Sequence, residues 1–124
     1  MTRRWAAKID DAQPGIITLL EASGFGVRSM ARLGGGWPDL HVWRHESAWL
    51  VEVKGEEGRL TEAERRWWTA YAGPGAIVRP SNIERWIIMA RDWAEGDAQE
   101  VTALAWIMRA EFVDVELRGG SHEQ

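Results

Sequence analysis

The chain has 124 residues, near the common size of one compact domain, and 45% of them are hydrophobic, which excludes an intrinsically disordered chain. It contains no cysteine, which excludes disulfides, thiolate metal sites and cysteine nucleophiles and is compatible with a reducing cytoplasm. The net charge of −4 argues against a protein that coats nucleic acid through a basic surface. No apolar run approaches the ~20 residues that cross a bilayer, so we expect no membrane-spanning segment.

The first half of the chain predicts one helix and three strands. Pro14 suits a helix start, and the apolar pattern that follows it ends near Gly24. The three strands are short runs rich in β-branched and aromatic residues, and they cover 27–33, 39–44 and 48–54. Three consecutive glycines at 34–36 form a loop, and the short connection at 45–47 predicts a β-hairpin.

The second half predicts two helices around a buried strand. Thr61 followed by Glu64 fits a capping box, in which the hydroxyl and the carboxylate bind free N–H groups at the helix start. AIVRP, at 76–80, is a short buried strand. A helix follows, with Ser81 at its N-cap and its end at Gly96.

The predicted order α-β-β-β-α-β-α is typical of a mixed α/β sheet with helices on its faces. After residue 96 the pattern is ambiguous: VTALAWIMRAEF suggests a helix and VDVEL a strand. We expect a single domain with a C-terminal extension and a mobile tail. The expected ranges are 1–124 for the domain, about 8–95 for its core, 97–118 for the extension and 119–124 for the tail.

Charged residues lie at the ends of two strands that otherwise look buried. Residues two apart in a strand share a face, so Glu52 and Lys54 project together. With the hairpin turn at 46–47, Asp39 would face Lys54 directly and Glu52 on the diagonal. The three side chains are therefore predicted to converge at one end of the sheet.

This convergence favours metal-dependent hydrolysis of a phosphodiester. Two neighbouring carboxylates resist joint ionisation, and a divalent cation removes that conflict. Oxygen-only ligands suit Mg²⁺ or Mn²⁺, which also accept phosphate oxygens as ligands. A lysine beside them can orient the attacking water and neutralise the charge that builds in the transition state.

The stretch GWPDL, then a strand, then LVEVK resembles the PD-(D/E)XK nuclease motif, with Pro38-Asp39 and Glu52-Val53-Lys54 in the motif positions. The segment GRLTEAERRWW resembles the next helix in the VRR-NUC and Holliday-junction-resolvase-like branch. The stretch IDDAQPGIITLLEASGFGV resembles the N-terminus of small phage-type members. The resemblance covers about residues 8–92 and implies a restriction-endonuclease-like αβββαβ core, with a mixed central sheet flanked by helices.

The same resemblance implies roles for individual residues. Asp39 and Glu52 would bind the metal, the Val53 carbonyl would add a ligand, and Lys54 would be the catalytic lysine. An acidic residue near the first helix often completes the site.

Asp10 matches that last position best, with Asp11 and Glu21 as alternatives. Glu64 stands where the family usually has a glutamine, so a role in the site and a role only in the helix cap both stay open.

Contacts with nucleic acid are expected from two kinds of residue. Gly35 and Gly36 would let the backbone approach DNA closely, and Arg59 and Arg65 would hold phosphates, although solvation is the simpler reading of both arginines. His41 points to the side of Asp39 by strand alternation, where packing or solvation is the more frequent role of a histidine.

These observations together predict a Mg²⁺- or Mn²⁺-dependent DNA endonuclease that acts on branched or junction DNA. We expect a homodimer whose interface draws on the nine tryptophans and the apolar C-terminal segment. The resemblance implies an intracellular, phage-encoded protein in a bacterial host. The alternative is a nuclease-fold module that binds nucleic acid or regulates without cutting.

Overall fold

The computed structural model describes residues 11–122 of the chain. Helices and strands follow one another in the predicted order α-β-β-β-α-β-α as far as the helix that ends at Glu95. The elements are α2 (Gln13–Ala22), β1 (Gly26–Ser29), the 3-10 turn η1 (Ala31–Leu33), β2 (Leu40–Arg44), β3 (Ser47–Val53), α3 (Glu62–Ala70), β4 (Gly75–Val78), α4 (Ile83–Glu95), α5 (Ala98–Arg109), the π-helical segment η2 (Ala110–Asp114) and α6 (Val115–His122).

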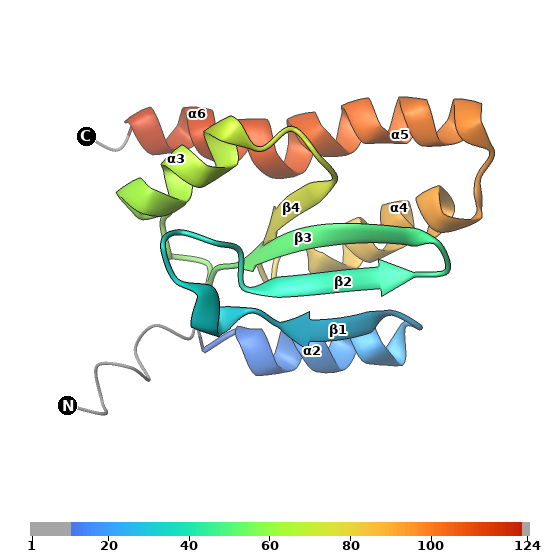
Figure 1. Ribbon diagram of the computed structural model, residues 1–124, viewed down its shortest axis with the longest axis horizontal. Helices are drawn as coiled ribbons and strands as arrows, with labels where there is room; N and C mark the ends of the chain where they lie inside the picture. Colours follow the sequence, from blue (N-terminus) through green and yellow to red (C-terminus); the bar gives the residue numbers. More distant parts are fainter. Residues whose placement is uncertain (1–10, 123–124) are drawn as a thin grey trace.

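Within the described residues, the strands form one mixed sheet in the order β1-β2-β3-β4. The first three strands are antiparallel, and β4 runs parallel to β3 because α3 carries the chain back between them. Helices α2 and α4 cover one face of the sheet, and α3 and α6 cover the other (Figure 1). This confirms the expected restriction-endonuclease-like architecture of a mixed sheet flanked by helices.

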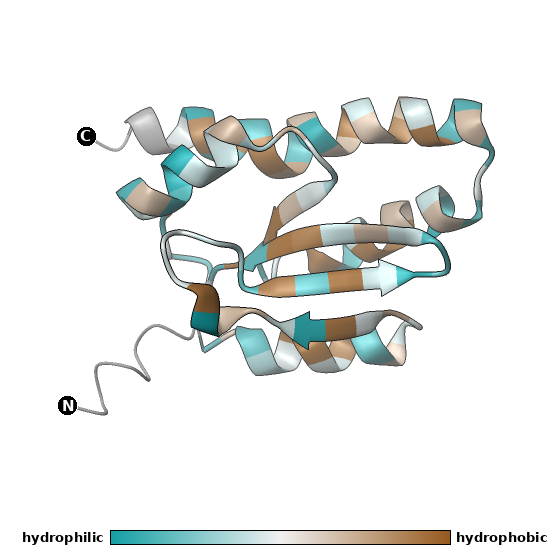
Figure 2. Cartoon of the chain, viewed as in Figure 1, coloured by the Kyte–Doolittle hydropathy of each residue, from teal (hydrophilic) through white to brown (hydrophobic). Residues whose placement is uncertain are grey.

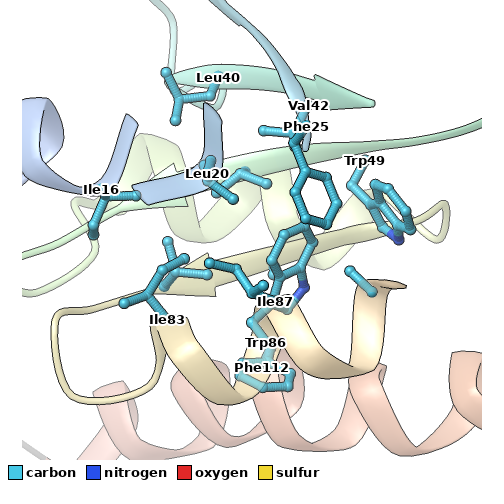
Figure 3. Close-up of a cluster of buried hydrophobic side chains, with 14 of the residues drawn as sticks. Ile16, Leu20, Phe25, Leu40, Val42, Trp49, Ile83, Trp86, Ile87 and Phe112 are labelled. Atoms are coloured by element: carbon cyan, nitrogen blue, oxygen red, sulfur yellow. The ribbon is translucent and has the colours of Figure 1, made fainter. Parts of the chain in front are cut away.

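The main core lies between the sheet and helices α2 and α4. Strand residues alternate between the two faces, and Figure 2 shows hydrophobic and hydrophilic residues in alternation along β2. Phe25, Trp49 and Trp86 meet at the centre of this core, with ring centroids 5.4–6.0 Å apart (Figure 3). Edge-to-face aromatic contacts of this kind stabilise beyond their area alone.

The opposite face carries a smaller cluster built on Trp68, Ile77 and Val113. Ile77 points to this side because its neighbours in β4 point into the main core. Met108 and Phe112 of the C-terminal segment pack into the main core as well. The C-terminal helices therefore contact both layers of the molecule. None of the helices in the described range has the length and apolar character needed to cross a membrane.

The strand expected at VDVEL was wrong, since α5, η2 and α6 form one helical run along the molecule (Figure 1). Val113 and Leu117 are four residues apart and both pack on the smaller cluster, whereas Val115 between them is 49% exposed. Two of the three alternating apolar residues are thus one helical turn apart, so the pattern also fits a helix that leaves Val115 exposed. Helix α6 extends to His122, into the range 119–124 that the sequence predicts as a tail.

The turn between β2 and β3 lies one residue earlier than predicted, which changes the register. Arg44 pairs with Ser47, so the turn consists of His45 and Glu46, with His45 in the left-handed region at φ 54°. Two-residue turns of this handedness match the twist of a hairpin. The whole β2–β3 ladder is therefore shifted by two residues from the prediction.

Two further boundaries differ from the sequence prediction. The strand expected over 27–33 ends at Ser29, and the helix-favouring residues after it form η1. The N-cap of α4 is Asn82 and not Ser81. The Asn82 side chain accepts from the Arg79 N–H at 2.7 Å, while the Ser81 hydroxyl donates to Glu56.

Candidate active site

Asp39 lies immediately before β2 and is held by two backbone groups. Its carboxylate oxygen Oδ2 accepts a hydrogen bond from the Val53 N–H at 2.8 Å, and its own carbonyl accepts one from the Met30 N–H at 2.7 Å. Burial is the largest influence on the pKa of Asp39 and raises it, while the Val53 hydrogen bond opposes the rise. The carboxylate is therefore fixed in position and poorly solvated.

Pro38 explains why the β2–β3 ladder stops beside the site. The register pairs Leu40 with Val51, so Pro38 would stand opposite Val53 if the ladder continued. Proline has no N–H and cannot donate to the Val53 carbonyl. The Val53 carbonyl therefore receives no hydrogen bond from Pro38, which suits a carbonyl that is expected to bind a cation.

Glu52 is the buried carboxylate of the site, with 2% of its surface exposed. Continuing the observed register places Asp39 opposite Glu52, so the expectation that Asp39 faces Lys54 directly was wrong. Burial, together with the neighbouring Asp39 and Glu64 charges, raises the pKa of Glu52 from its ordinary value of 4.5 to about 10. Its Oε1 atom has no hydrogen-bond partner among the described residues.

Lys54 joins the carboxylates from the end of β3. Its Nζ lies 2.8 Å from Glu64 Oε1 and 4.0 Å from Glu52 Oε2. Its side chain is only 12% exposed, so solvent screens these contacts weakly. The predicted convergence of Asp39, Glu52 and Lys54 at one end of the sheet is therefore present.

Glu64 both completes the cap of α3 and contacts Lys54. Its Oε1 accepts from the Thr61 N–H at 2.8 Å, and Thr61 Oγ1 accepts from the Glu64 N–H at 3.1 Å, which completes the capping box. The same Oε1 accepts from Lys54. Burial by itself raises the pKa of Glu64, but the hydrogen bonds from Lys54 and Thr61 outweigh it and lower that pKa.

The cluster fits a divalent cation, although it is not a complete cage. In the range 11–122, no group of three or more His, Asp or Glu side chains is arranged to hold a metal by itself. Asp39, Glu52 and the Val53 carbonyl could supply part of a ligand set, and Mg²⁺ is usually held by few protein ligands because it keeps several waters. A cation there would give Glu52 Oε1 the partner that it lacks and would favour the ionised carboxylates.

The structure describes two of the three acidic residues that were expected from the N-terminal region. Asp10 lies outside the described residues, and Asp11 is exposed in the turn before α2. Glu21 is at the C-terminal end of α2, where the neighbouring Gly24 carbonyl accepts from Arg44 at the far end of β2. Glu21 is therefore at the opposite end of the sheet from Asp39.

The residues expected to contact nucleic acid have different surroundings. Gly36 has φ +86°, and a Cβ there would lie 2.5 Å from the Ala63 carbonyl oxygen, so close packing on α3 requires this glycine. Gly35 also has positive φ but faces open space.

Arg65 donates to the Leu117 carbonyl of α6 at 2.8 Å, and Arg59 is exposed. Both arginines line a hollow of about 350 Å³ whose wall also contains Glu56, Glu57 and Glu116. This mixed lining makes the hollow a poor phosphate site. His41 packs on Trp43, with 5.2 Å between ring centroids.

Sequence reasoning missed two residues near this end of the molecule. Trp37, two residues before Asp39, is 45% exposed and packs on Trp67. Gln13 is buried, and its Oε1 has no partner among the described residues. The i, i+3, i+7 spacing of Gln13 with Ile16 and Leu20 was the signal that places it on the buried face of α2.

The family model of the VRR-NUC domain matches residues 8–79, which is more than half of the 124 residues. The chain belongs to the VRR-NUC family. The VRR-NUC domain is a nuclease domain, which agrees with the resemblance carried by the Pro-Asp and Glu-Val-Lys motifs. Comparisons with curated proteins and with solved structures gave no match. Asp39, Glu52, Lys54 and Glu64 all lie inside the matched range.

Glu52→Gln tests the buried carboxylate of this VRR-NUC protein through the pH dependence of folding. The raised pKa means that folded Glu52 keeps a proton that the unfolded chain releases above pH 4.5. The free energy of unfolding should therefore fall as pH rises from about 5 toward 10, by at most about 1.4 kcal/mol per pH unit for one proton. Glutamine carries no such proton, so the variant should gain stability over the wild type as pH rises.

Urea unfolding with a chelator present, at several values from pH 5 to 9, measures this difference. Parallel curves for the two proteins would contradict the assignment of the buried proton to Glu52.

Proposed function

We propose that this VRR-NUC protein hydrolyses phosphodiester bonds of DNA with Mg²⁺ or Mn²⁺ held by Asp39, Glu52 and the Val53 carbonyl. The observation that carries the proposal is the position of Glu52. A carboxylate that is 2% exposed, with one unpaired oxygen, lies opposite a second carboxylate and 4.0 Å from an ammonium group. Burying such a carboxylate lowers the stability of the fold, and this cost is offset when a bound cation pairs with it.

The residues of the chain then have separate tasks. The Val53 N–H and Met30 N–H fix Asp39, so its carboxylate needs no reorganisation when a cation binds. Glu64 holds the Lys54 ammonium beside the carboxylates, where it can orient a water and offset charge on the phosphate. The bound cation would supply Lewis-acid activation of the phosphate and of the attacking water.

DNA is the proposed substrate, and branched or junction DNA is the proposed structural class. Trp37 supports contact with a base that is not paired, because it exposes 45% of its surface two residues from Asp39 and is backed by Trp67. Trp67 in turn stacks on Tyr71 with ring centroids 4.6 Å apart, so the platform is rigid.

Lys54→Ala should lower the rate of cleavage by about 10²-fold or more, because positioned charge at a developing oxyanion is worth that much. The assay uses labelled branched, duplex and single-stranded DNA with Mg²⁺ or Mn²⁺. Glu52→Ala should have the same effect. Arg85→Ala is the control, since Arg85 is exposed on α4, on the other face of the sheet. DNA binding without cleavage by the wild type would instead support the non-cutting module.

Glu64→Gln separates the role of this residue in the site from its role in the cap. An amide oxygen can still accept from Thr61, so folding should change little, but the loss of one negative charge should weaken Mn²⁺ binding roughly three- to tenfold. Cleavage should persist at higher Mn²⁺. Thr61→Ala is the matched control: it should cost about 1 kcal/mol of stability and leave the Mn²⁺ affinity unchanged. Equal Mn²⁺ affinity of Glu64→Gln and wild type, measured by calorimetry, would assign Glu64 to the cap alone.

We also propose a homodimer. Trp106 and Ile107 on α5 expose 78% and 49% of their surfaces, and Val115 on α6 exposes 49%. Large apolar side chains on one helical run are typical of an interface between copies. Light scattering should give the mass of two chains, and the mass of one chain would refute the dimer.

A further inference from the structure

Arg79 connects the segment after Lys54 to the C-terminal helix. Its Nη1 donates to the Gly55 carbonyl at 2.6 Å and to the Glu56 carbonyl at 3.3 Å. Its Nε and Nη2 each donate to a different oxygen of Glu116 in α6, both at 2.9 Å. One guanidinium thus spans two parts of the chain that are about sixty residues apart.

The geometry of this contact is that of a fork. Two parallel hydrogen bonds between a guanidinium and a carboxylate fix the plane of the arginine as well as its position. Both side chains are largely buried, with 15% and 19% exposed for Arg79 and Glu116. Because Glu116 fixes the plane, the remaining nitrogen points at the Gly55 and Glu56 carbonyls.

Those carbonyls follow Lys54 directly. The Lys54 N–H donates to the Val78 carbonyl at 3.0 Å, which is the last bond between β3 and β4. The Gly58 N–H also donates to the Gly55 carbonyl, so Gly55 anchors the turn that leads toward α3. The N–H of Lys54 is therefore bonded to β4, and the carbonyls of the two residues after it are bonded to Arg79.

We propose that Glu116 is a positioning residue for the catalytic lysine, acting through Arg79 on the backbone that carries Lys54. The inference deepens the proposed function and rests on it. The match to the VRR-NUC family ends at Arg79, so Glu116 belongs to the part of the chain beyond the matched domain. Helix α6 is thus a working part of the active site as well as a cover for the sheet.

Glu116→Gln tests the proposal because it keeps the shape and removes the charge that holds the fork. Cleavage should lose roughly tenfold in kcat while KM for DNA stays unchanged, since the lysine is displaced and the DNA surface is not. Hydrogen exchange of the amides in 54–58 should become faster at a temperature where both proteins are folded.

Glu111→Gln is the matched control. Glu111 lies in η2 and pairs with Arg85 of α4, so it also ties the C-terminal segment to the core, but through Arg85 and not through the turn after Lys54. Its loss should leave kcat and the exchange of 54–58 at the wild-type level. Equal losses of kcat in the two variants, in proportion to their stability, would overturn the positioning role.

Arg79→Lys completes a double-mutant cycle, because one ammonium group cannot hold both the carboxylate and the turn. If Glu116 acts through Arg79, Glu116→Gln should add no further loss of kcat in the Arg79→Lys background. Additive losses would overturn the proposal. If wild-type protein cleaves no DNA, the proposed nuclease function fails, and unchanged exchange at 54–58 in Glu116→Gln would refute the clamp separately.

Discussion

The excess of carboxylate over ammonium at one end of the sheet is the constraint on which the rest of the site depends. In the described part of the chain, Asp39, Glu52 and Glu64 share the single ammonium of Lys54, and burial together with the neighbouring carboxylates raises the pKa of Glu52 to about 10. A folded protein holds such a cluster together only if the contacts around it stabilise the fold by more than the carboxylates destabilise it. The β2–β3 ladder, β4 and the cap of α3 supply those contacts.

The convergence of these residues was predictable from the sequence even though the register was not. The predicted ladder differed from the observed one by two residues, and a shift of two keeps every side chain on the same face. Asp39 therefore stayed on the side of Glu52, and only its direct partner changed. A shift of one residue would have moved it into the main core. Faces are specified by burial over many residues, whereas the exact pairing depended on His45 adopting positive φ in a two-residue turn.

The C-terminal segment could not be predicted in the same way. VDVEL satisfies a strand pattern and a helix pattern at once, and only packing of Val113 and Leu117 against α3 and β4 decides between them. The contacts of Glu116 and Arg79 depend on that decision, because a strand would have placed Glu116 elsewhere. Long-range ion pairs of this kind have no local signal in a single sequence, whereas the capping box at Thr61 is local and was read correctly.

Glu64 shows how local structure and chemistry are coupled in this protein. One oxygen accepts both the N–H that starts α3 and the ammonium of Lys54, so the helix cannot move without moving the lysine's partner. Gly36 packs on the same first turn of α3, and its positive φ lets the chain turn back toward Pro38 and Asp39. The beginning of α3 is thus in contact with the loop before Pro38 and with Lys54 directly after β3. A helix cap that normally affects stability alone here also sets the distance between the lysine and the carboxylates.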